Sequence, residues 1–155
     1  MRAGIALGSN LGNRHAFLSK ALVDLRNIHE DGEFLTSTFV ETPPQDCPPD
    51  SPDFLNAVVE LKTSLTPLKL LDKLRSLELS SGRESDHGFH TPRTLDLDLL
   101  YCDGLILDHP DLQLPHPRIR ERYFVLKPLT EIRPDLILPG WSKSCESYLL
   151  QIHKI

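Results

Sequence analysis

Two aspartates within a run of leucines are the residues of this sequence whose spacing best suits chemistry. Asp96 and Asp98 alternate with Leu95, Leu97 and Leu99, which is the period-two pattern of a strand with one buried face. Both carboxylates then lie on the opposite face, with their Cα atoms about 6.6 Å apart at ~3.3 Å per residue. Such a pair is either a solvated strand face or a site for a hard divalent cation, since Mg²⁺ commonly takes one or two carboxylates together with phosphate oxygens.

Basic residues flank the aspartate pair on both sides along the chain. Guanidinium groups suit bidentate contact with phosphate, so arginines that converge on a cation site would form a polyphosphate site. Taken one at a time, each is more often a solvated surface charge, and the spacing leaves both interpretations open. The residues concerned are Arg83 and Arg93 before the pair, and His116, Arg118, Arg120 and Arg122 after it.

Other chemistries have no motif in this sequence. There is no G-x-x-x-x-G-K-[ST] phosphate loop, no G-x-G-x-x-G and no G-x-S-x-G nucleophile motif. The three cysteines, Cys47, Cys102 and Cys145, lack the spacing of a zinc site. An odd, scattered set of this kind predicts reduced thiols in a cytoplasmic protein.

Length and charge limit the class of protein. The 155 residues suit one domain, expected to span 1–155, and the net charge is −5. A nucleic-acid-binding domain is typically basic, so we expect no nucleic-acid partner. The apolar run at the start is too short for a signal peptide, and no stretch approaches the ~18 apolar residues of a membrane span, so we expect no membrane partner.

Hydrophobic periodicity predicts the elements that would position the aspartates. The first six elements run β-α-β-β-α-β, which is the ferredoxin-like arrangement of an α+β protein. We expect a mostly antiparallel sheet with flanking helices, followed by a C-terminal extension with a short helix near 120–130 and an irregular tail. The strands are expected over 3–7, 34–41, 54–63 and 95–101, and the helices over 14–27, capped by Asn13, and from Pro67, capped by Thr66, to a stop at Gly82.

A proline-rich segment separates the second and third expected strands. Residues 42–53 contain five prolines. Proline fixes φ and cannot donate to a strand ladder, so this segment is expected to be a stiff extended loop. The loop is either a plain surface connection or one wall of a pocket.

Ordered motifs along nearly the whole chain resemble those of the 6-hydroxymethyl-7,8-dihydropterin pyrophosphokinase family. The most specific is Pro-Arg-Thr-Leu-Asp-Leu-Asp at 92–98. The resemblance implies an enzyme of folate biosynthesis that transfers pyrophosphate from ATP to the pterin hydroxymethyl group, giving AMP and the pterin diphosphate. The other matching segments are 7–12, 41–44, 54–57, 77–78, 82–83, 114–117 and 122–129.

The same resemblance implies a metal and nucleotide site. Two Mg²⁺ ions would be held by Asp96 and Asp98, which is the two-metal arrangement for in-line displacement. Arg83 and Arg93 would act with these aspartates in catalysis. The residues implied around ATP are Leu71, Arg75, Glu78, Arg83, Arg93, Leu99, His116, Pro117 and Arg122.

A pterin site is implied as well. Thr42 and Asn56 would hydrogen-bond the pterin, and Phe54 and Phe124 would stack on its flat ring. The proline-rich segment, with Pro43 and Pro44, would form a pocket wall. Other enzymes of the folate pathway are conceivable partners.

Two positions depart from the family pattern. Ser85 stands where a second basic residue is common, and His90 where a tryptophan is frequent. The departures keep a second interpretation open, a ferredoxin-like module that binds a small molecule or nucleotide for regulation, without turnover. A third, an RNA-binding ferredoxin-like domain, would need aromatics at the centre of the sheet and is opposed by the aspartate pair and the net charge.

Overall fold

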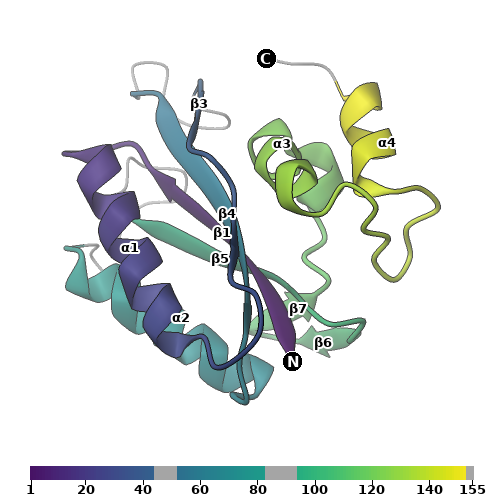
Figure 1. Ribbon diagram of the computed structural model, residues 1–155, viewed down its shortest axis with the longest axis horizontal. Coiled ribbons are helices and arrows are strands. Elements are labelled where there is room, and N and C mark those ends of the chain that lie inside the picture. The colour runs from purple at the N-terminus through teal and green to yellow at the C-terminus, as the bar shows by residue number, and fades with distance from the viewer. Residues whose placement is uncertain (44–51, 83–93, 153–155) are drawn as a thin grey trace.

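A computed structural model of the chain describes residues 1–43, 52–82 and 94–152. An antiparallel sheet lies at its centre, in the strand order β2-β4-β1-β5, with β3 also paired to β4 (Figure 1). The two long helices α1 and α2 cover one face of this sheet (Figure 1). These elements are β1 (Arg2–Ser9), α1 (Arg14–Ile28), β2 (Leu35–Thr36), β3 (Val40–Thr42), β4 (Phe54–Lys62), α2 (Pro67–Ser80) and β5 (Asp96–Cys102).

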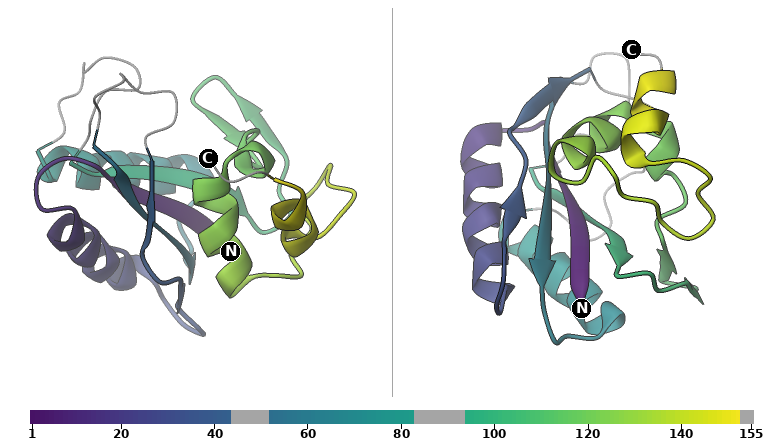
Figure 2. Two further views of the ribbon diagram at one scale, coloured as in Figure 1. Left: turned by 90° about the horizontal axis from the view of Figure 1, so that it is seen from above. Right: turned by 45° about the vertical axis from the view of Figure 1, so that its right-hand side comes forward.

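The expected ferredoxin-like α+β architecture is confirmed. Every strand pair of the main sheet is antiparallel, and the C-terminal extension places α3 and α4 on the face opposite α1 and α2 (Figure 2). None of the helices in the described part of the chain has the length and apolar character needed to cross a bilayer. The extension consists of β6 (Leu107–His109), β7 (Leu112–Leu114), the 3₁₀ turn η1 (Ile119–Glu121), α3 (Tyr123–Ile132) and α4 (Cys145–Gln151).

The helix ends carry the signals expected from the sequence. The side chain of Asn13 accepts a hydrogen bond from the backbone N–H of Ala16 at the start of α1. Thr66 does the same for Lys69 at the start of α2, where Pro67 is the first helical residue. Gly82 follows the end of α2 with φ +99°, a conformation that favours glycine. The predicted limits of α1 and α2 are therefore confirmed to within two residues, and the helix expected near 120–130 is α3 at Tyr123–Ile132.

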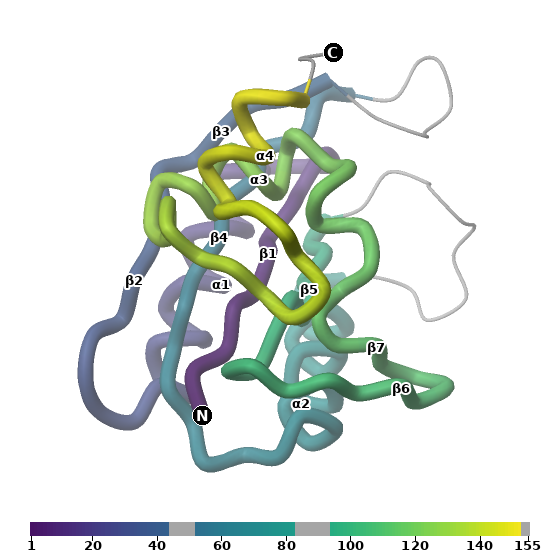
Figure 3. The backbone as a smooth tube through the Cα atoms, turned by 90° about the vertical axis from the view of Figure 1, so that its right-hand side faces the viewer, coloured from purple at the N-terminus to yellow at the C-terminus, as the bar shows by residue number. Residues whose placement is uncertain are grey.

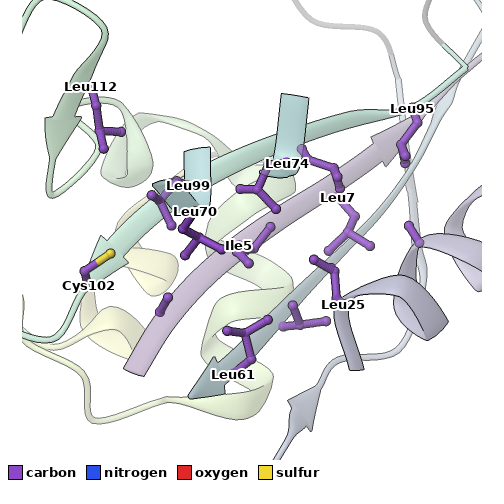
Figure 4. Close-up of a cluster of buried hydrophobic side chains, with 14 of the residues drawn as sticks. Ile5, Leu7, Leu25, Leu61, Leu70, Leu74, Leu95, Leu99, Cys102 and Leu112 are labelled. Carbon is purple, nitrogen blue, oxygen red and sulfur yellow. The ribbon is translucent and has the colours of Figure 1, made fainter. Parts of the chain in front are cut away.

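The sheet has a hydrophobic cluster on each face. Leu95, Leu97 and Leu99 are buried with α1 and α2, as their alternation predicts (Figure 4). On the other face, Val58 of β4 and Leu100 of β5 pack with the extension, including Leu126. The extension is thus anchored by a cluster of its own.

A bulge in β5 breaks the simple alternation of its side chains. The register of β5 against β1 shifts between Gly4 and Ile5, so Leu100 and Tyr101 both join the cluster under the extension. Gly4 makes room for the Tyr101 ring, because a Cβ at Gly4 would lie 2.8 Å from Tyr101 Cδ2 and closer still to other ring atoms. The tyrosine hydroxyl donates to Glu60.

Glu60 is a buried carboxylate at the centre of a charged network. It accepts hydrogen bonds from Arg2, Tyr101 and Arg133, with Arg133 Nε and Nη2 at 2.9 and 2.6 Å. Burial alone would raise the pKa of Glu60, but these donors outweigh it and hold the pKa below its ordinary value. Arg133 follows α3, so the network fastens the end of that helix to the sheet.

The structure differs from the sequence-based expectation in three places. The strand expected over 34–41 is split into β2 and β3, because Ser37 pairs with Val58 through its own N–H and through its hydroxyl, which accepts the Val58 N–H at 2.9 Å. The tail expected to be irregular contains α4, capped by Ser144. The β6–β7 hairpin was not expected, and it lies beside β5 (Figure 3).

Candidate active site

The strand register sets the candidate site residues in two rows across the sheet. Gly8 of β1 stands between Asn56 of β4 and Asp96 of β5, and Ala6 stands between Val58 and Asp98. Strands are about 4.8 Å apart, so Asn56 and Asp96 lie roughly 10 Å apart on the face that the extension covers. The register therefore brings together residues that are 40 positions apart in the sequence.

A cavity of about 390 Å³ lies beside the aspartates, which is within the usual size range of small-molecule sites. The structure brings six residues expected around ATP to its walls: Leu71, Arg75, Glu78, Leu99, His116 and Pro117. Asp96, Leu97 and Asp98 complete the wall formed by β5.

The hairpin adds a wall that sequence reasoning missed. Its residues at the cavity are Pro110, Asp111, Leu112 and Gln113. The Pro-Asp pair between two short apolar runs is a turn signal that could have predicted the hairpin. It could not have predicted that the turn folds back beside β5.

His116 is held as a neutral hydrogen-bond donor. Its Nδ1 accepts the backbone N–H of Arg118 at 3.1 Å, so Nε2 carries the ring proton. Burial, with help from the nearby charges of Arg122 and Arg118, lowers the pKa of His116 to about 4. Around neutral pH this side chain therefore offers an N–H group and no charge.

We expect the low pKa of His116 to make stability pH-dependent. Between about pH 6.5 and 4 the unfolded chain binds a proton there that the folded chain does not, so the free energy of unfolding falls as pH falls through this window. The contribution is about 2 kcal/mol after allowance for partial exposure. Urea denaturation of wild type and His116→Asn, which keeps an acceptor for Arg118, should diverge with pH over this range; parallel curves would contradict the assignment.

Arg122 lies between the aspartates and an aromatic ring. Its Nη1 is 3.9 Å from Asp98 Oδ2, and its guanidinium carbon is 5.6 Å from the centre of the Phe124 ring. Both residues belong to the start of α3. The extension therefore contributes a cation and an aromatic ring to the site formed by the sheet.

Two of the residues expected at the pterin, Phe54 and Asn56, lie next to Gly8, and a third, Thr42, is bonded to Asn56. Asn56 Nδ2 donates to Thr42 Oγ1 at 2.7 Å, and both side chains are buried. A Cβ at Gly8 would lie 3.3 Å from Asn56 Oδ1 and 3.5 Å from Phe54 Cδ1. Because Gly8 has no side chain, the surface of β1 stays open between Asn56 and Phe54 on one side and Asp96 on the other. Pro43 is exposed directly after β3.

Some of the expected residues lie outside the described ranges. They are Pro44, Arg83 and Arg93, together with the divergent positions Ser85 and His90. The described residues that bear on the site are those of the sheet, α2, the hairpin and the extension.

The donor set at the aspartates fits a hard cation bound partly by its ligand. Among the described residues no three His, Cys, Asp or Glu side chains come together as a metal site. A cation on Asp96 and Asp98 would therefore complete its shell with water and ligand oxygens. That preference for few carboxylates, water and phosphate is typical of Mg²⁺.

A carboxylate pair, cationic and neutral donors, and a cavity on a ferredoxin-like sheet fit a group-transfer enzyme that acts on a phosphorylated substrate. The profile of the 7,8-dihydro-6-hydroxymethylpterin-pyrophosphokinase family matches residues 4–134, and the chain belongs to this family. It is an ATP-dependent diphosphotransferase, which transfers pyrophosphate from ATP to hydroxymethyldihydropterin in folate biosynthesis.

Curated relatives support this assignment over most of this chain. The 2-amino-4-hydroxy-6-hydroxymethyldihydropteridine pyrophosphokinase of Haemophilus influenzae is 43% identical over 142 residues, covering 89% of this chain and 85% of that protein. The protein of the same name from Pseudomonas aeruginosa is 41% identical over 138 residues, covering 89% and 84%. The folic acid synthesis protein fol1 of Pneumocystis carinii is 41% identical over 150 residues, which are 96% of this chain but 20% of that protein.

Solved structures share the fold. An HPPK-DHPS crystallised in complex with substrates matches with a TM-score of 0.74 at 13% identity, and Plasmodium falciparum HPPK-DHPS with SDX-DHP matches with 0.73 at 15%. Each match covers 97% of this chain, and 43% and 44% of those longer chains.

Proposed function

We propose that the two rows across the sheet form one continuous site for the two substrates. ATP occupies the cavity between α2, β5 and the hairpin, and the pterin lies over Gly8. The observation that carries this assignment is the row of Asn56, Gly8 and Asp96. It places the Asn56 amide, which can recognise a flat ring, roughly 10 Å from the carboxylates, and the residue of β1 between them is a glycine.

In this proposal Asp96 and Asp98 hold two Mg²⁺ ions. When bound, these ions would neutralise the phosphates and make the pterin hydroxyl more acidic. Arg122, which lies near Asp98, contacts a phosphate, as do Arg83 and Arg93. Because the aspartates supply few ligands, the polyphosphate itself helps to complete the site.

His116 serves as a donor and not as a base. With a pKa lowered to about 4, it is too weakly basic to take a proton from an alcohol near neutral pH. In the unliganded protein its Nε2–H is therefore available to a phosphate or ribose oxygen near neutral pH. His116 therefore contributes by positioning the phosphate and stabilising its charge, and not by abstracting a proton.

The pterin contacts divide into polar and aromatic groups. Thr42 and Asn56 already hydrogen-bond each other, so their remaining donor and acceptor capacity is held in a fixed direction. Phe54 of β4 and Phe124 of α3 stack on the pterin ring. Pro43 and Pro44 form the outer wall.

The aromatic assignment gives a direct test. Phe54→Ala and Phe124→Ala should each weaken binding of a non-reactive pterin by roughly 0.5–1.5 kcal/mol beyond the lost buried area, with a much smaller effect on a non-hydrolysable ATP analogue. Isothermal titration calorimetry measures both affinities. Phe34→Ala is the control, because that ring contacts Arg26 and His29. Equal losses for both ligands would place Phe54 and Phe124 in the core.

We also propose that residues 1–155 act as one cytoplasmic pyrophosphokinase domain.

The length of one relative motivates a proposed partner, because the chain spans about a fifth of the Pneumocystis folic acid synthesis protein. We propose association with another enzyme of the same pathway. Analytical ultracentrifugation of the chain mixed with DHPS, the second part named in the solved HPPK-DHPS chains, tests it. A faster-sedimenting boundary supports association, and two independent boundaries oppose it.

A further inference from the structure

One carboxylate at the cavity wall holds the main chain between the two aspartates. Glu78 lies on the buried side of α2, in line with Leu70 and Leu74. Its Oε2 accepts the backbone N–H of Leu97 at 2.7 Å. Leu97 is the single residue between Asp96 and Asp98, so Glu78 contacts the segment that carries both.

The edge position of β5 gives this contact its importance. Within the described residues β5 is the last strand of the main sheet and pairs on one side with β1. Successive N–H groups of an antiparallel strand point alternately to the two sides, so the Leu97 N–H points away from β1 and toward α2. Glu78 occupies the place where a further strand would offer a carbonyl group.

We propose that Glu78 is a positioning residue for the cation pair, acting through the main chain of Leu97. This inference rests on the proposed metal role of Asp96 and Asp98. It differs from the role as a nucleotide contact expected for Glu78, because the carboxylate acts on the protein. The directions of the two aspartates depend on the backbone at 96–98, and the Glu78 bond fixes that backbone on its outer side.

The number of ligands that the described residues supply makes such fixing important. Within those residues no three His, Cys, Asp or Glu side chains come together, so this part of the proposed site depends on the directions of Asp96 and Asp98. Supporting groups around a metal site typically contribute 10–100-fold to metal affinity when they orient its ligands.

The experiment compares variants of Glu78 by metal binding. Mn²⁺ binding is measured by electron paramagnetic resonance in the presence of α,β-methylene-ATP. Glu78→Ala, which removes the acceptor, should weaken Mn²⁺ binding about 10-fold or more. Glu78→Gln, which keeps an acceptor of the same length, should stay within about 3-fold. Asp72→Ala, which removes an exposed carboxylate from the same helix, should leave Mn²⁺ binding unchanged.

A second variant and a second ligand separate this role from the alternatives. Glu78→Asp keeps the charge but is one methylene too short to reach the Leu97 N–H, so it should weaken Mn²⁺ binding as Glu78→Ala does. It provides the test if the alanine variant folds poorly. Mn²⁺ binding by Glu78→Asp equal to wild type would overturn the proposal. Adenosine binding without divalent cations should be the same in wild type and Glu78→Gln. A loss there would instead make Glu78 a nucleotide contact.

The reference variant is Asp96→Asn in the same assay. If Asp96→Asn weakens Mn²⁺ binding while Glu78→Ala does not, the positioning role is wrong and the metal site stands. If Asp96→Asn leaves Mn²⁺ binding unchanged, the metal assignment fails and the positioning role fails with it. Weakening by both, with retention in Glu78→Gln, supports the proposal.

Discussion

Replacing either Asp96 or Asp98 by asparagine is expected to lower turnover by a factor on the order of 10³ or more. The substitution keeps the size of each side chain and removes its charge, so in the proposed site it would remove one carboxylate ligand from the cations. Metal stabilisation of transferred phosphate contributes several kcal/mol, and each 1.36 kcal/mol is tenfold in rate. Formation of AMP from ATP and the dihydropterin at saturating Mg²⁺ measures the effect.

The control for this prediction is another aspartate on a strand. Asp108 of β6 is exposed, and Asp108→Asn should keep wild-type turnover. Removing one of two like charges from a solvated face would be neutral or slightly stabilising. Near-normal turnover in both site variants, with unchanged thermal unfolding, would therefore show that Asp96 and Asp98 belong to a solvated strand face and do not bind the cations.

Gly4→Ala is expected to destabilise the fold by about 3 kcal/mol or more, the upper end of the cost of overpacking a core. The added methyl would overlap the ring of Tyr101, which is 3% exposed and fixed at its hydroxyl by Glu60. The ring cannot move away without breaking that hydrogen bond and opening the bulge in β5. Chemical denaturation followed by circular dichroism measures the loss.

A double-mutant cycle isolates the cause of this loss. Tyr101→Ala is itself destabilising because it leaves a cavity, but in that background the addition of Gly4→Ala should cost little. Coupling energies between residues in contact reach 0.5–3 kcal/mol. Equal costs of Gly4→Ala in the two backgrounds would show that the methyl acts on the backbone of β1 and not on the tyrosine ring.

Sequence patterning predicted the core of the fold because each element carries its own local signal. The leucines of β5 alternate, Asn13 and Thr66 cap their helices, and Gly82 ends α2. The split of the second strand was not predictable in this way. It depends on the Ser37 hydroxyl, which accepts the Val58 N–H in place of a backbone carbonyl. This is a tertiary contact, and the β-propensity of the residues does not predict it.

The extension was the least predictable part for a related reason. Helix α4 has seven residues and one buried member, Cys145, so its hydrophobic period is too short to recognise. The bulge that turns Leu100 and Tyr101 to one face breaks the period on which strand prediction depends.

The candidate site also has a part that the sequence predicts and a part that it does not. The aspartate pair could be predicted because two carboxylates interrupt an apolar strand. The hairpin residues at the cavity, such as Gln113, carry no such signal, and they reach the site because the hairpin lies beside β5. The positioning bond of Glu78 also joins segments that only the folded chain brings together.

The separate anchoring of the extension has a consequence for how affinity is set. Segments that bury their own hydrophobic cluster open in partial unfolding events without loss of the whole fold. In the proposed site, a pterin between Phe54 on the sheet and Phe124 on the extension would bind only molecules whose extension is packed on the sheet, so its apparent affinity would scale with the fraction of such molecules. Arg133, which joins the end of α3 to Glu60, would then raise pterin affinity by stabilising the packed extension, without contacting the ligand.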